Sequence, residues 1–404
     1  MLKKIASSLS ENGADAWVIY DFASQNPAFV SIFGKNFSTR KCFAVIDKAM
    51  NNTLICHSID ALGIVKAEVT KNFRLKVYNT WQQLDLLLEE TLSDYDTVMM
   101  EISENGLMPR SSYVDYGTVC SVKRFVKNII SSADLFQALA ATFFGESLEF
   151  HKKAAITVNA IKDEAFDLIS RTVRQKGLVS EYEIQQFILK RFSDNGMVTD
   201  SAPIVAIEKN AASPHYEPTK DNHSFIRKGN MVLIDMWAKY DHPSAVFADI
   251  TWMGFVGDSV PDKYRKPFET IKTAIDKALD FLGRELVLRK VSGYEVDDIC
   301  NSYLKESGYG AYIVHRTGHS ISVGDSDHGI GVNIDNFETH DTRSIINGVA
   351  FSLEPGIYTP EFGIREEINV YIENNKPCVY TKRQSDFIIP VSYTHLTLPT
   401  IRLV

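Results

Sequence analysis

The sequence predicts two domains, an α/β domain followed by an α+β domain in which helices pack outside a curved, mostly antiparallel sheet. Three observations support this. The 404 residues exceed the usual length of one domain, and their composition, 45% hydrophobic and 23% charged, is that of a globular protein. In the first third, short apolar segments alternate with helical periodicity. Further along, capped helices alternate with apolar segments that carry carboxylates.

The first domain is expected to span residues 1–135. The polar start of the chain after Lys4 favours an amphipathic first helix over a signal peptide. Residues 81–92 have helical periodicity. Short apolar runs rich in β-forming residues predict strands at 15–20, 41–46, 52–56 and 97–101.

The second domain is expected to span residues 136–391 and to open with a long helix at 147–174. Two capping boxes, Ser180-Glu-Tyr-Glu and Ser292-Gly-Tyr-Glu, each place a serine three residues before a glutamate and so mark helix starts. Helices are therefore predicted at 181–194, 261–282 and 293–306. Residues 392–404 do not continue the domain and are predicted to be a non-native tail.

Composition restricts the classes of partner. The net charge is −8 and no basic block occurs, which argues against nucleic acid and anionic membranes as main partners. No apolar run approaches the length of a membrane span. The five cysteines are odd in number and widely spaced, which favours a reducing compartment, so a cytoplasmic location is expected.

Four carboxylates occupy apolar, strand-like segments: Asp235, Asp249, Glu354 and Glu367. A single acidic residue in a strand is usually a satisfied structural group. Four that face one another would repel strongly, unless divalent cations between them turned this repulsion into binding energy. With His319 as one nitrogen donor, the set suits manganese, cobalt or zinc at a two-metal hydrolytic centre.

The order of these residues and their contexts carry a family resemblance. Asp, then Asp-Ile-Thr, Gly-His, Glu-Pro-Gly and Arg-x-Glu resembles the pita-bread metallopeptidases, in particular the Xaa-Pro aminopeptidases (aminopeptidase P) and prolidases. The resemblance covers about residues 1–390 and is strongest over 204–372. It implies a pita-bread catalytic domain preceded by a creatinase-type α/β domain, which in that group helps to form oligomers and narrows access to the site.

The resemblance also implies roles for the five candidate metal ligands. Asp235 would chelate one metal ion and Asp249 would bridge two. His319 and Glu354 would complete the second, with Glu367 bridging. A hydroxide held between two ions, expected to be Mn²⁺ with Co²⁺ or Zn²⁺ as alternatives, would be the nucleophile, and Glu354 would also be the general base.

Glu366 and Glu367 are adjacent, so the fifth ligand needs a choice between them. The family spacing Arg-x-Glu selects Glu367. Because neighbouring residues on a strand face opposite ways, only one of the two is expected to reach the metal ions.

Four further residues match pocket positions of the family. His215 and His328 are predicted as catalytic residues, with His215 able to donate a proton and His328 near the scissile carbonyl. His315 and Arg365 are predicted to bind substrate, although Arg365 could instead pair with a metal-ligand carboxylate. Histidine fits this chemistry because the nitrogen of an Xaa-Pro bond, a tertiary amide, must be protonated as it leaves.

The sequence departs from the family pattern in four places, one of which is Asp249-Ile-Thr-Trp-Met in place of the frequent Asp-Ile-Thr-Arg-Thr. Trp237 stands where Gly is frequent. The interval from Asp235 to Asp249 is about three residues longer than usual, and the interval from His319 to His328 about two longer. These changes fall in loops and pocket walls, so they leave the ligands in place and the substrate preference open. We expect the side chain of Trp237 to pack within the strand layer, with a place in the pocket wall as the alternative.

The expected function is therefore a dinuclear-metal exopeptidase, most like aminopeptidase P, that acts on short proline-containing peptides. A prolidase, which cleaves only dipeptides, is the near alternative. A non-catalytic pita-bread binding protein is the alternative from another class, but such proteins usually lose ligands. The family resemblance also implies a homo-oligomer, in the simplest case a dimer.

Overall fold

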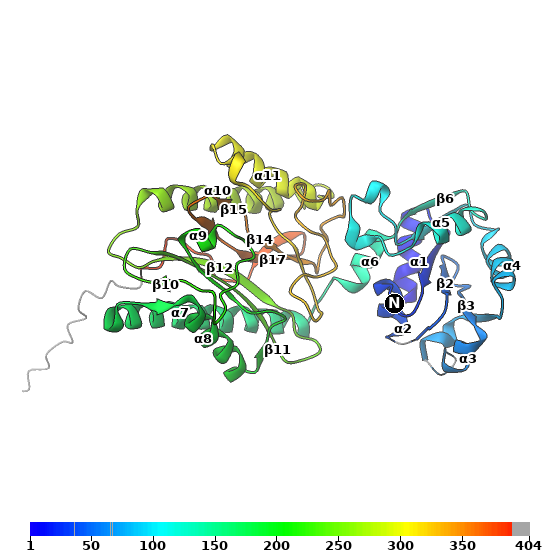
Figure 1. Cartoon of the computed structure of the whole chain (residues 1–404). Coiled ribbons are helices and arrows are strands. Elements are labelled where there is room, and N and C mark those ends of the chain that lie inside the picture. Colours follow the sequence, from blue (N-terminus) through cyan, green and yellow to red (C-terminus); the bar gives the residue numbers. More distant parts are fainter. Residues whose placement is uncertain (36, 65, 67, 390–404) are drawn as a thin grey trace, which may run out of the picture. The chain divides into compact units, whose positions relative to one another are not determined.

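The computed structural model describes residues 1–389 except 36, 65 and 67 (Figure 1). The chain divides into two compact units. Unit 1 comprises residues 1–142 together with 339–343, and unit 2 comprises 143–338 and the chain from 344 on. The predicted boundary at 135/136 falls inside helix α6, and the predicted tail lies outside the described residues.

Unit 1 contains a six-stranded sheet with strand order β4-β3-β2-β1-β5-β6. The pairs β1–β2 and β2–β3 are antiparallel, and β3–β4, β1–β5 and β5–β6 are parallel. The four strands predicted for this region are confirmed. The strands are β1 (Ala16–Asp21), β2 (Cys42–Asp47), β3 (Thr53–His57), β4 (Arg74–Tyr78), β5 (Thr97–Met100) and β6 (Asn128–Ser131).

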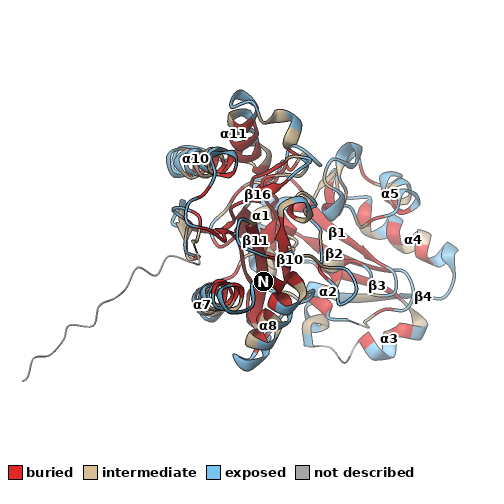
Figure 2. Cartoon of the chain, turned by 60° about the vertical axis from the view of Figure 1, so that its left-hand side comes forward, coloured by how far each residue is buried: buried red, intermediate tan, exposed pale blue. Residues whose placement is uncertain are grey.

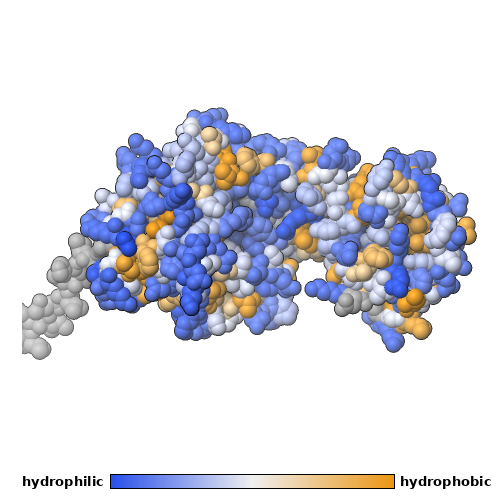
Figure 3. Space-filling model, in the orientation of Figure 1, coloured by the Kyte–Doolittle hydropathy of each residue, from blue (hydrophilic) through white to orange (hydrophobic). Residues whose placement is uncertain are grey.

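Helix α4 of unit 1 buries its apolar stripe against this sheet. The predicted helix at 81–92 is α4: Thr80 accepts a hydrogen bond from the Gln83 amide at its start, and leucines 84, 88 and 92 are buried at four-residue spacing. Figure 3 shows hydrophobic groups scattered over the visible surface of the chain.

The helices of unit 1 are α1 (Leu2–Glu11), α2 (Pro27–Phe33), α3 (Ser58–Ile64), α4 (Trp81–Leu92), α5 (Tyr116–Lys123) and α6 (Ala133–Ala140), with 3₁₀ turns η1 (Glu68–Asn72), η2 (Glu104–Gly106) and η3 (Pro109–Ser111).

The helices of unit 2 start where the capping boxes predict. Both Ser180 with Glu183 and Ser292 with Glu295 form reciprocal capping boxes. Among the described residues, no helix is long and apolar enough to cross a membrane. The helices are α7 (Glu146–Lys176), α8 (Glu181–Asp194), α9 (Glu208–Ala211), α10 (Asp262–Glu285) and α11 (Gly293–Glu306), with a 3₁₀ turn η4 (Gly310–Tyr312).

The strands of unit 2 pair antiparallel, as the sequence predicts. One sheet joins β12, β11 and β8 with β9 also on β11, and a second has the order β13-β14-β17-β18. The strands are β7 (Val179–Ser180), β8 (Met197–Val198), β9 (Ile204–Ile207), β10 (Phe225–Ile226), β11 (Met231–Tyr240), β12 (Ala248–Phe255), β13 (Ser320–Ile321), β14 (Ala350–Leu353), β15 (Gly356–Tyr358), β16 (Gly363–Arg365), β17 (Ile368–Glu373) and β18 (Lys376–Val379).

The strands of unit 2 lie between two layers of helices, α7 with α8 and α10 with α11, and are almost wholly buried (Figures 1 and 2). Strand β11 divides its residues between the two cores. Val232 and Ile234 pack in the core of α7 and α8, and Leu233 and Trp237 in the core of α10 and α11. Because side chains alternate along a strand, Asp235 shares the side of Leu233 and Trp237. The candidate ligands of β11 and β12 therefore face away from α7.

Candidate metal centre

Two of the candidate ligands lie on the hairpin of β11 and β12. Asp235 stands opposite Thr251, and Trp237 stands opposite Asp249. Since alternate residues of a strand share a face, these four side chains lie on one face of the hairpin. The motif Asp-Ile-Thr thus places Asp249 and Thr251 side by side.

The other three candidate ligands lie at strand ends in the second sheet. His319 comes directly before β13, Glu354 directly after β14, and Glu367 directly before β17. The sheets are joined beside Asp249, whose backbone amide donates to Asn369 Oδ1 (2.9 Å) and whose carbonyl accepts from Asn369 Nδ2 (2.8 Å). This amide side chain replaces a missing strand partner and fixes Asp249 against β17.

The glycine of the Gly-His motif has a packing reason. A Cβ atom on Gly318 would lie 1.9 Å from the Ser352 carbonyl oxygen, so the chain before β13 can approach β14 only without a side chain there. The Ser352 amide donates to the His319 carbonyl (2.9 Å), and the Glu354 amide to the Thr317 carbonyl (2.8 Å). This close approach of the two segments brings the side chains of His319 and Glu354 next to each other.

The buried carboxylates carry oxygens without partners among the described residues. Asp235 Oδ1, Asp249 Oδ1 and Glu367 Oε1 are shielded from solvent and accept no hydrogen bond. Leaving such oxygens unsatisfied costs about 1–3 kcal/mol each, and more when they are charged. Cations at this point would satisfy all three, so the donor set fits a metal centre.

The imidazole of His319 presents Nε2 to this cluster. Its Nδ1 lies 3.1 Å from the Ser320 carbonyl oxygen and so carries the proton, because a carbonyl can only accept. Nε2 lies 3.4 Å from both Asp249 Oδ2 and Glu354 Oε1. The ligand atoms of Asp249, His319 and Glu367 all lie within 4.8 Å of one another.

Asp235 is held by Arg365 and lies outside that group of three. The buried guanidinium of Arg365 donates to Asp235 Oδ2, to Thr251 Oγ1 (3.1 Å) and to Tyr358 Oη (2.6 Å). Of the two partners predicted for Arg365, the structure thus shows the carboxylate of a candidate ligand, Asp235. Thr251 Oγ1 also donates to Glu367 Oε2 (2.9 Å), so this hydroxyl connects Glu367 with Arg365, which holds Asp235.

The protonation of the ligands differs in a way that suits cation binding. Burial, together with the charge of neighbouring carboxylates, raises the pKa of Asp249 and of Glu367 well above ordinary values. Burial opposes ionisation of Glu354, but its electrostatic interactions with His319, His315 and Arg365 outweigh burial and lower its pKa. Without a cation, protons would compete for the site, whereas Glu354 stays ionised.

Glu366 points away from these residues. Its Oε1 accepts the backbone amide of Gln384 (3.3 Å), and burial raises its pKa to about 7. Glu367 instead reaches Thr251. The two adjacent glutamates therefore face opposite ways, as expected for neighbours on a strand.

His315 has partners at both ring nitrogens. Nδ1 lies 2.6 Å from the Arg316 carbonyl oxygen and Nε2 lies 2.7 Å from Tyr358 Oη. Nε2 must therefore accept the hydroxyl proton of Tyr358, and burial lowers the pKa of His315, in keeping with a neutral ring. Its predicted contact with substrate stays a prediction. Tyr358, which joins His315 to Arg365, has no signal in the sequence beyond its place after Glu354-Pro-Gly.

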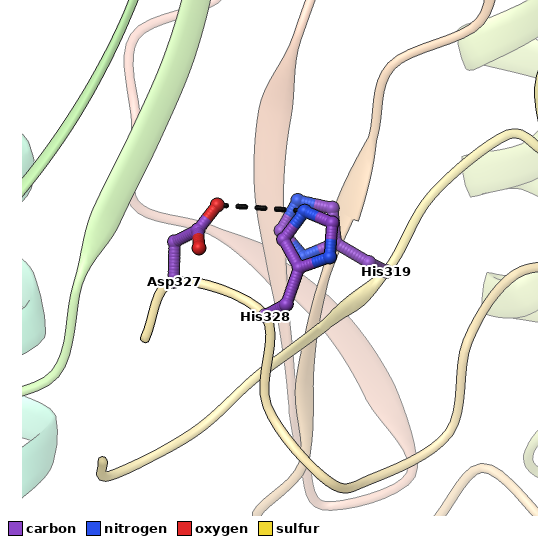
Figure 4. A group of neighbouring side chains, drawn as sticks. All are labelled: His319, Asp327 and His328. Carbon is purple, nitrogen blue, oxygen red and sulfur yellow. Dashed lines mark ion pairs between the residues drawn. The ribbon is translucent and has the colours of Figure 1, made fainter. Parts of the chain in front are cut away.

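His328 lies directly on His319 (Figure 4). The rings are stacked, with centroids 3.8 Å apart and planes inclined by 21°, and His328 Nε2 lies 3.4 Å from Asp327 Oδ2. Burial raises the pKa of Asp327 to about 6. The ligand atoms of His319, Asp327 and His328 also lie within 4.8 Å of one another. Stacked rings cannot both direct a lone pair at one ion in their planes, so we do not assign a metal to this trio.

His215 is exposed in the turn that follows α9. Among the described residues, no hydrogen bond or ion pair joins it to the five candidate ligands, so its predicted role in proton donation stays a prediction. The turn itself is held near the site. A Cβ atom on Gly363 would lie 1.9 Å from the Ala211 carbonyl oxygen, which shows how closely the end of α9 packs on β16.

Replacing Tyr358 by phenylalanine should lower both stability and activity, although Tyr358 is not one of the five candidate ligands. The change leaves Arg365 Nη1 and His315 Nε2 without their partner, which should cost about 1–3 kcal/mol of unfolding free energy and about 10- to 100-fold in kcat/KM. Urea denaturation and peptide hydrolysis measure the two effects. Tyr371→Phe, which removes a buried hydroxyl bonded to the Phe143 carbonyl (2.8 Å), is the control and should lose stability alone. Equal activity losses in both variants would contradict the assignment.

Comparisons with known proteins identify the family of the chain. The family model described as Metallopeptidase family M24 matches residues 149–374. The Xaa-Pro dipeptidase of Lactobacillus delbrueckii subsp. lactis is 29% identical over 237 residues, 56% of each chain. The Xaa-Pro dipeptidase of Pyrococcus furiosus is 26% identical over 303 residues, 74% of this chain and 77% of that protein. The matches thus span between about half and three quarters of these relatives.

Solved structures share the fold over nearly the whole chain. An Xaa-Pro dipeptidase from Bacillus anthracis is 20% identical, with a TM-score of 0.60 over 96% of this chain and 98% of that one. The proline aminopeptidase P II from Yersinia pestis is 16% identical, with a TM-score of 0.57 over 96% and 97%. The predicted fold, a pita-bread domain preceded by an α/β domain, is confirmed. The family model covers more than half of the chain, and the protein therefore belongs to metallopeptidase family M24.

Proposed function

We propose that the chain is a metal-dependent exopeptidase that hydrolyses the Xaa-Pro bond of short peptides. The observation that carries the proposal is the set of three buried, unpartnered carboxylate oxygens of Asp235, Asp249 and Glu367, two of which belong to residues whose ligand atoms lie within 4.8 Å of that of His319. Neutral hydrogen-bond donors do not fill this set, and cations would. The relatives named Xaa-Pro dipeptidase or Xaa-Pro aminopeptidase support the choice of substrate.

Two divalent ions, with Mn²⁺ as our first choice, would be held by the five predicted ligands, Asp235, Asp249, His319, Glu354 and Glu367. When bound, such a pair supplies an activated water nucleophile and stabilises developing negative charge. Oxygen-rich donor sets with one imidazole suit Mn²⁺ and also accept Co²⁺ and Zn²⁺.

Glu354 is suited to be the general base. Its pKa is lowered, so it is ionised at neutral pH, and its side chain is 17% exposed, more than the other carboxylates of the site. Ser352 Oγ donates to Oε1 (3.0 Å) and fixes the direction of the carboxylate. A partly exposed, oriented carboxylate can take a proton from an attacking water.

A histidine would return a proton to the proline nitrogen. His328 is half-buried and stacked on His319, which places its ring beside the ligands. His215 lies on the exposed turn after α9 and would reach a substrate only from this turn. We therefore propose His328 as the nearer catalytic histidine and His215 as a second donor.

Both aminopeptidase P and prolidase activities suit the site, and the similar proteins carry both names. Hydrolysis of Gly-Pro and of an Xaa-Pro-Xaa peptide by metal-stripped protein, before and after Mn²⁺ is added, separates them. Cleavage of the longer peptide would establish an aminopeptidase P, and cleavage confined to the dipeptide a prolidase. Gly-Ala serves as the control substrate and should be cleaved poorly.

Binding of Mn²⁺ by folded protein without cleavage of either proline peptide would contradict the proposal and favour the binding-protein alternative.

A cytoplasmic location is also proposed, supported by cysteines 42, 56, 120, 300 and 378, which are all free thiols. A homodimer is proposed on the family resemblance, and sedimentation would test it. Unit 1 exposes several apolar side chains, which supports a contact there: Ile59, Leu62, Trp81 and Leu86.

A further inference from the structure

The segment that carries His328, residues 322–328, is tied to the hairpin of β11 and β12 at several points. We call this segment the His328 loop. Val323 in the loop forms an isolated antiparallel bridge with Val246, in the connection between β11 and β12. This bridge is the first tie between the loop and the hairpin.

Lys239 provides the second tie. It follows Asp235 and Trp237 at two-residue intervals on β11, so it lies on the same face. Its side chain is only 11% exposed, and its ammonium donates to the Gly324 carbonyl and lies 4.0 Å from Asp325 Oδ1. The ammonium also lies 5.4 Å from the Phe247 ring centre. A largely buried ammonium depends on such acceptors, because leaving it unpaired is costly.

Trp237 provides the third tie, through Asp200. The indole Nε1 donates to Asp200 Oδ1 (2.7 Å), and Asp200 Oδ2 accepts the backbone amide of Asp327 (3.4 Å). Trp237 is buried, as expected for strand packing, but its polar atom faces the loop and not the apolar core. The residue next to Asp327 is His328.

The three ties lie at residues 323, 324 and 327, so they hold the loop on both sides of its turn. They leave His328 in place over His319, with ring centroids 3.8 Å apart. We propose that Lys239 and the Trp237–Asp200 pair are positioning residues, which fix the His328 loop and so place the His328 ring at the metal centre. This inference rests on the proposed function for its kinetic consequence, and on contacts alone for its structural one.

Lys239→Met is the main test, because methionine keeps the unbranched chain and removes the ammonium. We expect kcat for an Xaa-Pro peptide to fall about 10- to 100-fold, as for a misplaced catalytic group, with a smaller change in KM. Lys239→Arg should recover most of the loss. Lys162→Met is the matched control, because Lys162 is fully buried against Trp252, on the opposite face of β12, and should leave kcat nearly unchanged.

A double-mutant cycle separates positioning from general destabilisation. In a His328→Ala background, Lys239→Met should have little further effect on kcat, because the ring it places is gone. Equal losses in both backgrounds would overturn the proposal. Should Lys239→Met fail to fold, Asp200→Asn tests the same cycle through the other tie.

A readout that needs neither metal nor turnover keeps the two proposals distinguishable. In metal-free protein with isotope-labelled histidine, the ring signals of His319 and His328 should be displaced by their stacking. Lys239→Met and Asp200→Asn should shift these signals, and Lys162→Met should not. Unchanged signals would overturn the inference. If the wild-type protein cleaves no Xaa-Pro peptide, the proposed function fails while this measurement still decides the role of the loop.

Discussion

Replacement of Glu367 by glutamine is expected to abolish metal-restored peptide hydrolysis, with a loss of kcat/KM on the order of 10³-fold or more. Glutamine keeps the shape of the side chain and removes the charge. Glu367 Oε1 is one of the unpartnered buried oxygens, while Oε2 is held by Thr251. The fold should survive, since losing one of several mutually repelling carboxylates relieves strain in the metal-free protein.

Glu366→Gln is the matched control for this variant. The side chain is next in sequence, equally buried and of the same type, and its Oε2 is also unpartnered, but its Oε1 accepts the Gln384 amide and it faces away from Thr251 and Asp249. Its activity and metal content should stay near those of the wild type. Metal content by mass spectrometry and hydrolysis of an Xaa-Pro peptide measure both variants. A loss of metal in Glu366→Gln, with retention in Glu367→Gln, would reverse the assignment of the ligand.

Addition of Mn²⁺ to metal-stripped protein is expected to raise the melting temperature by about 5–10 °C. A ligand at 100 times its Kd stabilises the folded state by about 2.7 kcal/mol, and about 2–4 °C corresponds to each kcal/mol for a domain of this size. The physical source is the satisfaction of the orphan oxygens of Asp235, Asp249 and Glu367. Calorimetry measures the shift, and Asp249→Asn should remove most of it. An equal shift in that variant would place the ion elsewhere.

The gain from Mn²⁺ should also grow with pH. The pKa values of Asp249 and Glu367 are raised in the folded state, so the metal-free folded protein binds more protons than the unfolded chain above the ordinary carboxyl pKa of about 4. The stability of the metal-free protein therefore falls as pH rises through this window. Because metal ions displace these protons, the rise in melting temperature should be larger at about pH 8 than at about pH 5.5. A larger rise at the lower pH would contradict the proton competition.

The sequence by itself determined the local structure and the identity of the candidate ligands. Capping boxes at Ser180 and Ser292 marked helix starts, and apolar runs marked four of the strands of unit 1, because both signals depend on residues close in the chain. The order of the carboxylates and His319 indicated the family, and the family spacing Arg-x-Glu selected Glu367 over Glu366, while strand periodicity said that only one of the two could reach the centre. Thr251 could have been found in the same way, since it shares the face of Asp249.

Only the tertiary structure decided which partners these residues have. Arg365 pairs with Asp235, 130 positions away, and the hydroxyl of Tyr358 is hydrogen-bonded to Nε2 of His315. Lys239 reaches the loop of His328 across 85 positions. Such contacts form where the two sheets of unit 2 and their loops meet. No local sequence pattern predicts them, because the free energy of each contact depends on how closely segments far apart in the sequence approach and how deeply they are buried. The sequence thus named the groups at the centre, and the fold set their protonation and orientation.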